Sequence, residues 1–177
     1  MPSQATINAQ AVVDSIDQIT DELRQEIDGE LKDGANQIAR QAIVNAPADQ
    51  GFLRNRIKSI RIDEMEYEVV SLSLYSPYLE FGTGEHVQIP AGLEDYAAQF
   101  KADSSLYSED NGELSFKEAI FAWCARHGIE QELWYAIYIY IGIHGIEARP
   151  FFFPAVEALR PVIINNVVSV VKNVIGQ

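Results

Sequence analysis

The residues that could do chemistry are few and widely spaced. The three histidines, His86, His127 and His144, form no His-Glu-x-x-His motif, and the single cysteine, Cys124, has no partner for a Cys-x-x-Cys pair. Cys124 and His127 have the spacing of two zinc ligands. Without a second pair of ligands, the pattern favours a core thiol beside a histidine at a helix end. The sequence therefore predicts no metal ion and no other cofactor.

Motifs for attack on a substrate are also missing. The sequence has no Gly-x-Ser-x-Gly elbow, and Gly82-Thr83-Gly84 is too short to cradle a phosphate. A small-molecule enzyme with a pocket around Tyr78, Glu80 and His144 stays open as an alternative. Since no catalytic constellation is evident, we predict that the protein is not an enzyme.

Glu80 lies in a stretch, residues 75–84, whose sequence requires a fixed shape. It reads Tyr-Ser-Pro-Tyr-Leu-Glu-Phe-Gly-Thr-Gly. Pro77 fixes its own φ and disfavours the α conformation at Ser76, so we expect an arriving strand to change direction there. Gly82 and Gly84 permit positive φ, and the aromatic residues can anchor the turn to a core. We interpret the stretch as a structural corner.

The composition bounds the class of protein. A chain of 177 residues with 47% hydrophobic content can build one domain with a sizeable core, which we assign to residues 1–177. The net charge of −13 argues against a protein that wraps nucleic acid or lies on an anionic membrane. The lone cysteine fits a reducing compartment, and we expect no signal peptide. The most apolar run, residues 133–143, is too short to cross a bilayer.

Charge is unevenly distributed along the chain. Residues 47–63 hold four bases and two acids, for a net charge of +2, whereas residues 64–115 hold eleven acids and one base, for −10. Complementary rims of this kind suit a subunit that meets copies of itself head to tail, although solvated loops explain them equally well. The candidates for a subunit interface are the basic residues Arg54, Arg56, Lys58 and Arg61.

A long helix, a hairpin and a last helix account for most of the apolar pattern. Apolar residues recur at steps of three and four after Asn8, the expected N-cap, which predicts a helix that runs to about Asn45. This length exceeds that of most globular helices, so part of the apolar stripe is expected to pack on a neighbouring subunit. Residues 57–62 and 65–75 have the pattern of two antiparallel strands, with a bulge near Val69. The last helix is predicted at residues 155–174, with a kink at Pro161.

Two further segments separate the corner from the last helix. Residues 85–115 are acidic and rich in loop-forming clusters, so we expect little regular structure there. Residues 116–126 are predicted to form a helix with Ser115 as its N-cap. Residues 131–144 combine strand propensity with helix-end signals on both sides, and we favour a helix.

Three blocks of the sequence resemble one protein family. Residues 46–54, Ala-Pro-Ala-Asp-Gln-Gly-Phe-Leu-Arg, resemble the Ala-Pro-x-Asp-Thr-Gly-x-Leu-Arg signature of the gene-product-ten-like tail-component family of HK97-type tailed phages. Residues 75–83 are similar to that family's Tyr-Ala-Pro-Tyr-Val-Glu-Phe-Gly-Thr corner, and residues 145–151 to its Ala-Arg-Pro-Phe-Leu run. Gln50, Arg56 and the pair Phe152-Phe153 depart from the family pattern, which bears on partner specificity more than on the fold.

The resemblance implies a fold and a function. The fold is α+β, a small antiparallel sheet packed by a long N-terminal helix and a C-terminal helix, with an acidic loop insertion at 85–115 and a helical one at 116–145. The function implied is structural: a tail completion or terminator subunit in the neck of the virion, assembled in the host cytoplasm. The subunits are expected to form a ring, sixfold by resemblance, around the DNA channel. A head completion or stopper subunit is the alternative.

The resemblance also implies partners and extends the corner. The partners would be sister copies, the neighbouring connector and tail-tube proteins, and DNA only by non-specific proximity, with no membrane. Arg149 is our candidate for a buried arginine that hydrogen-bonds to Glu80 and joins the corner to the last helix. The predicted structural corner comprises Tyr75, Pro77, Tyr78, Glu80, Phe81, Gly82, Arg149, Pro150 and Phe151.

Overall fold

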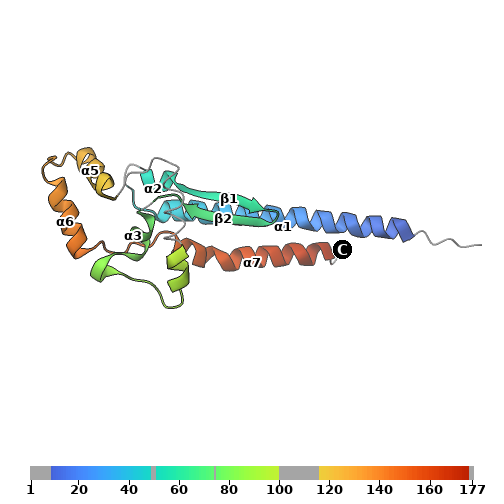
Figure 1. Cartoon of the computed structure of the whole chain (residues 1–177). Helices are drawn as coiled ribbons and strands as arrows, with labels where there is room; N and C mark the ends of the chain where they lie inside the picture. The colour runs from blue at the N-terminus through green and yellow to red at the C-terminus, as the bar shows by residue number, and fades with distance from the viewer. Residues whose placement is uncertain (1–8, 49–50, 74, 100–115, 176–177) are drawn as a thin grey trace, which may run out of the picture.

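The computed structural model describes residues 9–48, 51–73, 75–99 and 116–175. The fold is α+β, as predicted: two long helices, a two-stranded antiparallel sheet and several short helices (Figure 1). The expected helix caps Asn8 and Ser115 and the acidic clusters of residues 103–112 lie outside the described residues. The elements are α1 (Ala9–Asn45), α2 (Phe52–Asn55), β1 (Ile57–Asp63), β2 (Glu66–Ser71), α3 (Ser76–Phe81), η1 (Gly84–His86), α5 (Phe116–Arg126), α6 (Trp134–His144) and α7 (Phe153–Ile175).

The long helices α1 and α7 lie side by side and run in opposite directions (Figure 1). Helix α1 has 37 residues, about 55 Å, and α7 has 23, about 35 Å, so the N-terminal part of α1 extends beyond its partner. The two helices approach closely at Gly34, where an added Cβ would lie 2.7 Å from Cγ1 of Ile163. The small side chains of Ala35, Ala39, Ala42 and Ala46 are also buried along α1. Because small residues recur at these spacings, the hairpin and α7 can pack closely against α1.

The β1–β2 hairpin packs against α1. Ile57 pairs with Ser71 and Ile60 with Glu68, and Ile62 is the extra residue between Arg61 and Asp63. The predicted bulge near Val69 is therefore wrong. Val70 is buried and Val69 packs against the core cluster, so both faces of β2 find apolar neighbours and the change of apolar phase requires no bulge.

The corner is a short helix, and the predicted strand over residues 65–75 ends earlier, at Ser71. Ser76 begins helix α3, which corrects the expectation that Pro77 would keep this residue out of a helix. A proline is tolerated in the first turn because its missing N–H would have no partner there. Gly82 and Gly84 have φ values of 75° and 60°, which confirms the predicted positive φ at both glycines.

The two insertions differ in their outcome. Residues 85–99 contain more regular structure than expected, because η1 reaches His86 and residues 94–99 are helical; residues 100–115 lie outside the described part. Helices α5 and α6 confirm the predicted helices at 116–126 and 131–144. Helix α7 begins two residues before the predicted start and continues through Pro161. Helices α5 and α6 form a lobe at the opposite end of the molecule from the free end of α1 (Figure 1).

Candidate functional site

The centre of the corner is a buried carboxylate. Glu80 is 1% exposed, and its oxygens accept hydrogen bonds from three successive backbone N–H groups: Phe151 and Phe152 donate to Oε2 at 2.9 Å each, and Phe153 donates to Oε1 at 2.8 Å. These N–H groups lie at the start of α7, where a helix has unbonded donors and the positive end of its dipole. Glu80 therefore caps α7 from a distant part of the chain.

The predicted ion pair between Glu80 and Arg149 is wrong. Arg149 is exposed, and the partners of the Glu80 carboxylate are backbone groups. The two segments still meet, since the backbone N–H of Arg149 donates to the carbonyl oxygen of Leu79 at 2.7 Å. One signal pointed to the true arrangement: Pro150 to Pro154 contain no Ser, Thr, Asp or Asn, so a helix that starts there lacks a local N-cap and must find one elsewhere.

The other predicted corner residues differ in burial. Pro77, Phe81, Gly82 and Phe151 are buried, Tyr75 and Tyr78 are half-buried, and Pro150 is exposed. At Gly82 the φ is positive and an added Cβ would lie 2.3 Å from the backbone oxygen of His86, so a larger residue does not fit. The corner is thus a structural junction in which α3 and the start of α7 share one small core.

A second junction joins the α5–α6 lobe to the corner. Thr83 donates its backbone N–H to the carbonyl oxygen of Ile146 at 2.9 Å, and the N–H of Ile146 donates to Oγ1 of Thr83 at 2.7 Å. Gly145 packs closely here, because an added Cβ would lie 2.2 Å from the backbone oxygen of Thr83. A reciprocal pair of hydrogen bonds therefore attaches the lobe to the corner.

The four basic residues proposed for a subunit interface have different environments. Arg54 donates from Nε and Nη2 to the carbonyl oxygen of Ala46, at 3.0 and 2.7 Å, and so binds an unbonded carbonyl at the end of α1. Nη1 of Arg56 lies 3.3 Å from the carbonyl oxygen of Leu72. Arg61 pairs with Asp28, whereas Lys58 is exposed on β1. Arg54 and Arg56 thus form hydrogen bonds within their own subunit.

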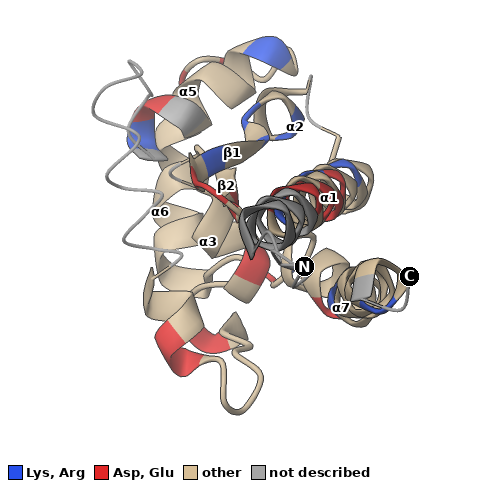
Figure 2. Cartoon of the chain, turned by 90° about the vertical axis from the view of Figure 1, so that its right-hand side faces the viewer, with Lys and Arg blue, Asp and Glu red and all other residues tan. Residues whose placement is uncertain are grey.

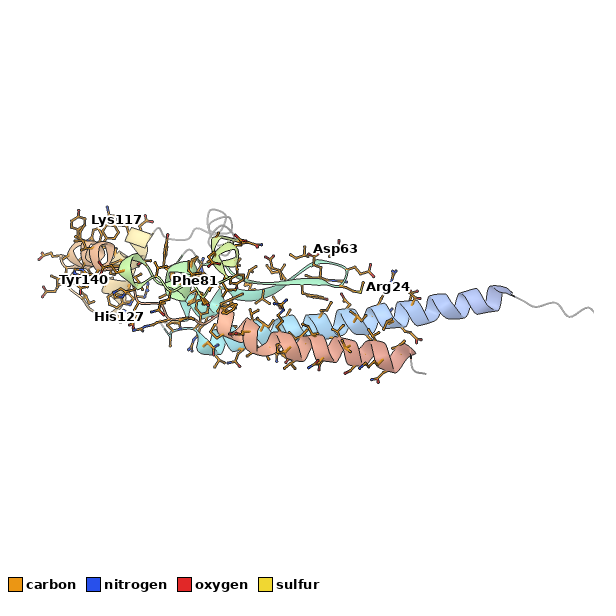
Figure 3. All side chains as sticks on the ribbon, turned by 90° about the horizontal axis from the view of Figure 1, so that it is seen from below. Arg24, Asp63, Phe81, Lys117, His127 and Tyr140 are labelled. Atoms are coloured by element: carbon orange, nitrogen blue, oxygen red, sulfur yellow. The ribbon has the colours of Figure 1, made fainter. Side chains whose placement is uncertain are left out.

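Asp28 holds the tip of the hairpin against α1. Its Oδ1 accepts hydrogen bonds from the backbone N–H of Met65 at 3.0 Å and from Nη2 of Arg61 at 3.2 Å, and Oδ2 accepts the hydroxyl of Tyr67 at 3.0 Å. Desolvation raises the pKa of Asp28, but these hydrogen bonds and the charge of Arg61 outweigh it and lower the pKa overall. Desolvation and the neighbouring carboxylate raise the pKa of Tyr67. Figure 3 shows Arg24 and Asp63 at this tip, far from Tyr140 and His127.

The residues considered for chemistry do not assemble into a reactive group. The carboxylate of Glu80 accepts hydrogen bonds from the start of α7. His144 is exposed, and its ring stacks on that of Tyr140 at a centroid distance of 3.9 Å. Cys124 is buried and His127 is exposed against Trp123, as expected for a core thiol beside a helix end. Within residues 9–48, 51–73, 75–99 and 116–175, no group of three or more His, Cys, Asp or Glu side chains could hold a metal ion.

Exposed apolar side chains gather on helices α6 and α7. Helix α6 has no buried residue, although its sequence, Trp-Tyr-Ala-Ile-Tyr-Ile-Tyr-Ile-Gly-Ile-His, is apolar all round, and Figure 2 shows it without acidic or basic residues. Ile143 is 70% exposed. On α7, Val162, Ile164 and Val168 are exposed, and residues 153–174 are long and apolar enough to cross a membrane, judged by length and composition alone. Surfaces of this kind mark contact sites.

A family model matches the N-terminal part of the chain. Residues 10–82 match the family model described as "Bacteriophage HK97-gp10, putative tail-component". The match includes α1, the hairpin and α3, and with them the block at 46–54 and most of the block at 75–83; the block at 145–151 lies outside it. No curated protein and no solved structure matches the chain. Over residues 10–82, the chain is therefore similar to the HK97-gp10 family of phage tail components, and this similarity suggests a structural protein of the virion.

Proposed function

We propose that this tail component is a tail completion or terminator subunit that forms a ring around the DNA channel at the head-tail interface. The observation that carries the proposal is α6, an apolar helix with no buried residue. A helix that is apolar on all sides is normally buried, so its outer side needs a partner. A subunit in a ring has such partners on both sides, and a protein that forms a rigid joint needs no reactive group.

The shape and charge of the subunit agree with this role. The α1–α7 pair is an elongated spacer of about 55 Å, and the corner fixes its end to the α5–α6 lobe. We propose that residues 1–177 act as one domain, because hydrogen bonds join α3 to the start of α7 and also join Thr83 of the corner to Ile146, just after α6. A net charge of −13 around a DNA channel would repel the duplex and let it slide.

The basic segment contributes less to the proposed ring than its charge suggests. Arg54 and Arg56 donate to carbonyl oxygens of their own chain, and Arg61 pairs with Asp28. Lys58 is exposed and is the member of the group best placed to meet an acidic neighbour. Any contact between this basic segment and an acidic segment of a neighbouring subunit would therefore depend mainly on Lys58, and Arg61 would contribute less.

The proposal is tested by the assembly state and by the place of the chain in the particle. Native mass spectrometry and electron microscopy of the purified full chain should show closed rings. Cryo-electron microscopy of the virion should then place the ring on the tail side of the neck. A chain that stays monomeric and is absent from virions would refute the proposal, and density on the portal side would instead assign it as a head completion or stopper subunit.

A further inference from the structure

The outward face of α6 is an apolar stripe with an acid at one end. Tyr135, Ile139 and Ile143 recur at steps of four, so they lie on one side of the helix, and all three are exposed. Glu132 is also exposed and lies in the turn just before α6, near the N-terminal end of this stripe. The opposite side of α6 faces α5, where Trp134 packs edge-on against Phe121 at a centroid distance of 5.6 Å.

The outward face of α7 is a similar stripe that carries a base at its far end. Pro161, Ile164, Val168 and Lys172 recur at steps of three and four and are all exposed, with Ile164 at 52% and Val168 at 43%. Glu157 lies four residues before Pro161 on the same side. Ile163 marks the other side of the helix, since it contacts Gly34 of α1. This stripe is therefore turned away from the α1–α7 contact.

We propose that the α6 stripe of one copy packs against the α7 stripe of a second copy, with the two helices antiparallel. In this orientation Glu132 meets Lys172, Glu157 lies toward His144, and Ile139 packs near Ile164. The two helix dipoles also oppose each other favourably. The stripes match in length: Glu132 to His144 and Glu157 to Lys172 each extend about 20 Å.

Charge and position favour a second copy over other occupants. Glu132 beside the α6 stripe meets Lys172 of the α7 stripe, and Glu157 faces the polar ring of His144, whereas a lipid tail offers no partner to the charges of Glu132, Glu157 or Lys172. Helix α6 and the exposed part of α7 lie in opposite halves of the molecule (Figure 1), so a head-to-tail contact between them can repeat from copy to copy until a ring closes. The proposal rests on the ring of the proposed function and adds the surfaces that form it.

Cysteine cross-linking tests the pairing directly. The native Cys124 is buried, so introduced thiols at exposed positions can be labelled selectively. A mixture of Ile139→Cys and Ile164→Cys chains, treated with a short bismaleimide, should give dimers that contain one chain of each kind, while each variant alone should give none. Val44→Cys, at an exposed site on α1, replaces one partner as the control and should not link. Dimers from Ile139→Cys alone would overturn the proposal in favour of a symmetric α6–α6 contact.

Charge reversal tests the orientation. Lys172→Glu should raise the dissociation constant of the assembly by about fivefold per contact, and Glu132→Lys in the same chain should restore it, because each contact then has the pair reversed. Lys32→Glu, at an exposed site on α1, is the matched control and should change little. Rings that form and enter virions without the mixed cross-link or the rescue would overturn this inference and leave the proposed function standing. Flotation with phosphatidylethanolamine and phosphatidylglycerol vesicles, without the cross-link, would assign the stripes to a membrane instead.

Discussion

The body of the molecule and the α5–α6 lobe make opposite use of apolar residues. In the body, α1, the hairpin, the corner and the start of α7 bury a shared cluster that includes Ala42, Leu53, Phe81 and Phe151. In the described part of the lobe, Cys124 is the one buried residue, although α6 is more apolar than α1. The comparison teaches that the apolar content of a segment does not say where its partner lies. The body buries its apolar residues within the chain, and the lobe leaves most of its apolar residues exposed.

The largest expected effect comes from removing the buried cap in the body. Glu80→Ala leaves three N–H groups at the start of α7 without acceptors, two of them buried and one part-buried, and should lower the free energy of unfolding by about 3 kcal/mol or more. Urea denaturation followed by circular dichroism measures the change. Glu147→Ala, at an exposed site in the segment before α7, is the control and should have little effect. Equal stability of the two variants would contradict the capping role of Glu80.

A smaller effect is expected where α1 and α7 touch. Gly34→Leu places a side chain against Ile163 and should cost about 1–2 kcal/mol, since overpacking outweighs the gain in helix propensity. Ile163→Ala in the same chain should recover part of this loss in thermal denaturation. Gly29 has no atom within 4 Å of an added Cβ, so Gly29→Ala should stabilise the protein slightly. If both glycine variants raise the melting temperature, the close helix contact is wrong.

The hairpin tip should respond to acid. The folded state lowers the pKa of Asp28, so its stabilising contribution is complete above the ordinary value of 3.8 and is lost as the pH falls through the lower folded value. Asp28→Asn should therefore be less stable than the wild type at about pH 7, and the difference should shrink toward about pH 3. The Met65 amide donates a hydrogen bond to Asp28, so hydrogen exchange of this amide reports the same change locally. A difference that grows as the pH falls would contradict the assignment.

The smallest effect on folding is expected in the lobe. This effect tests most directly whether the lobe and the body use their apolar residues differently. Ile143→Ser removes a side chain that is 70% exposed, so it should change the free energy of unfolding by less than about 0.5 kcal/mol while it weakens self-association. Val44→Ser, at a 69% exposed site on α1, is the matched control and should alter neither property. A large loss of monomer stability in Ile143→Ser would mean that the lobe keeps its apolar residues for its own folding, as the body does.

The class of fold, the long helices and the place of the corner could all be predicted from the amino-acid sequence. Helix periodicity, prolines and glycines act over a few residues, so the spacing of apolar residues in α1 and the positive φ of Gly82 could be predicted from local chemistry. The bulge at Ile62 could not, because whether Val69 needs one depends on what covers each face of β2.

The pairing of groups far apart in the chain became visible in the folded molecule. Glu80 and Phe151 are 71 residues apart, and a carboxylate accepts a backbone N–H as readily as a guanidinium, so the sequence could not choose Phe151 to Phe153 over Arg149. The same holds for Arg54, whose charge suggested a neighbouring subunit but whose guanidinium reaches the carbonyl at the end of α1. Exposure of α6 was also beyond the sequence, since an apolar helix buried in its own chain and one awaiting a partner have the same composition.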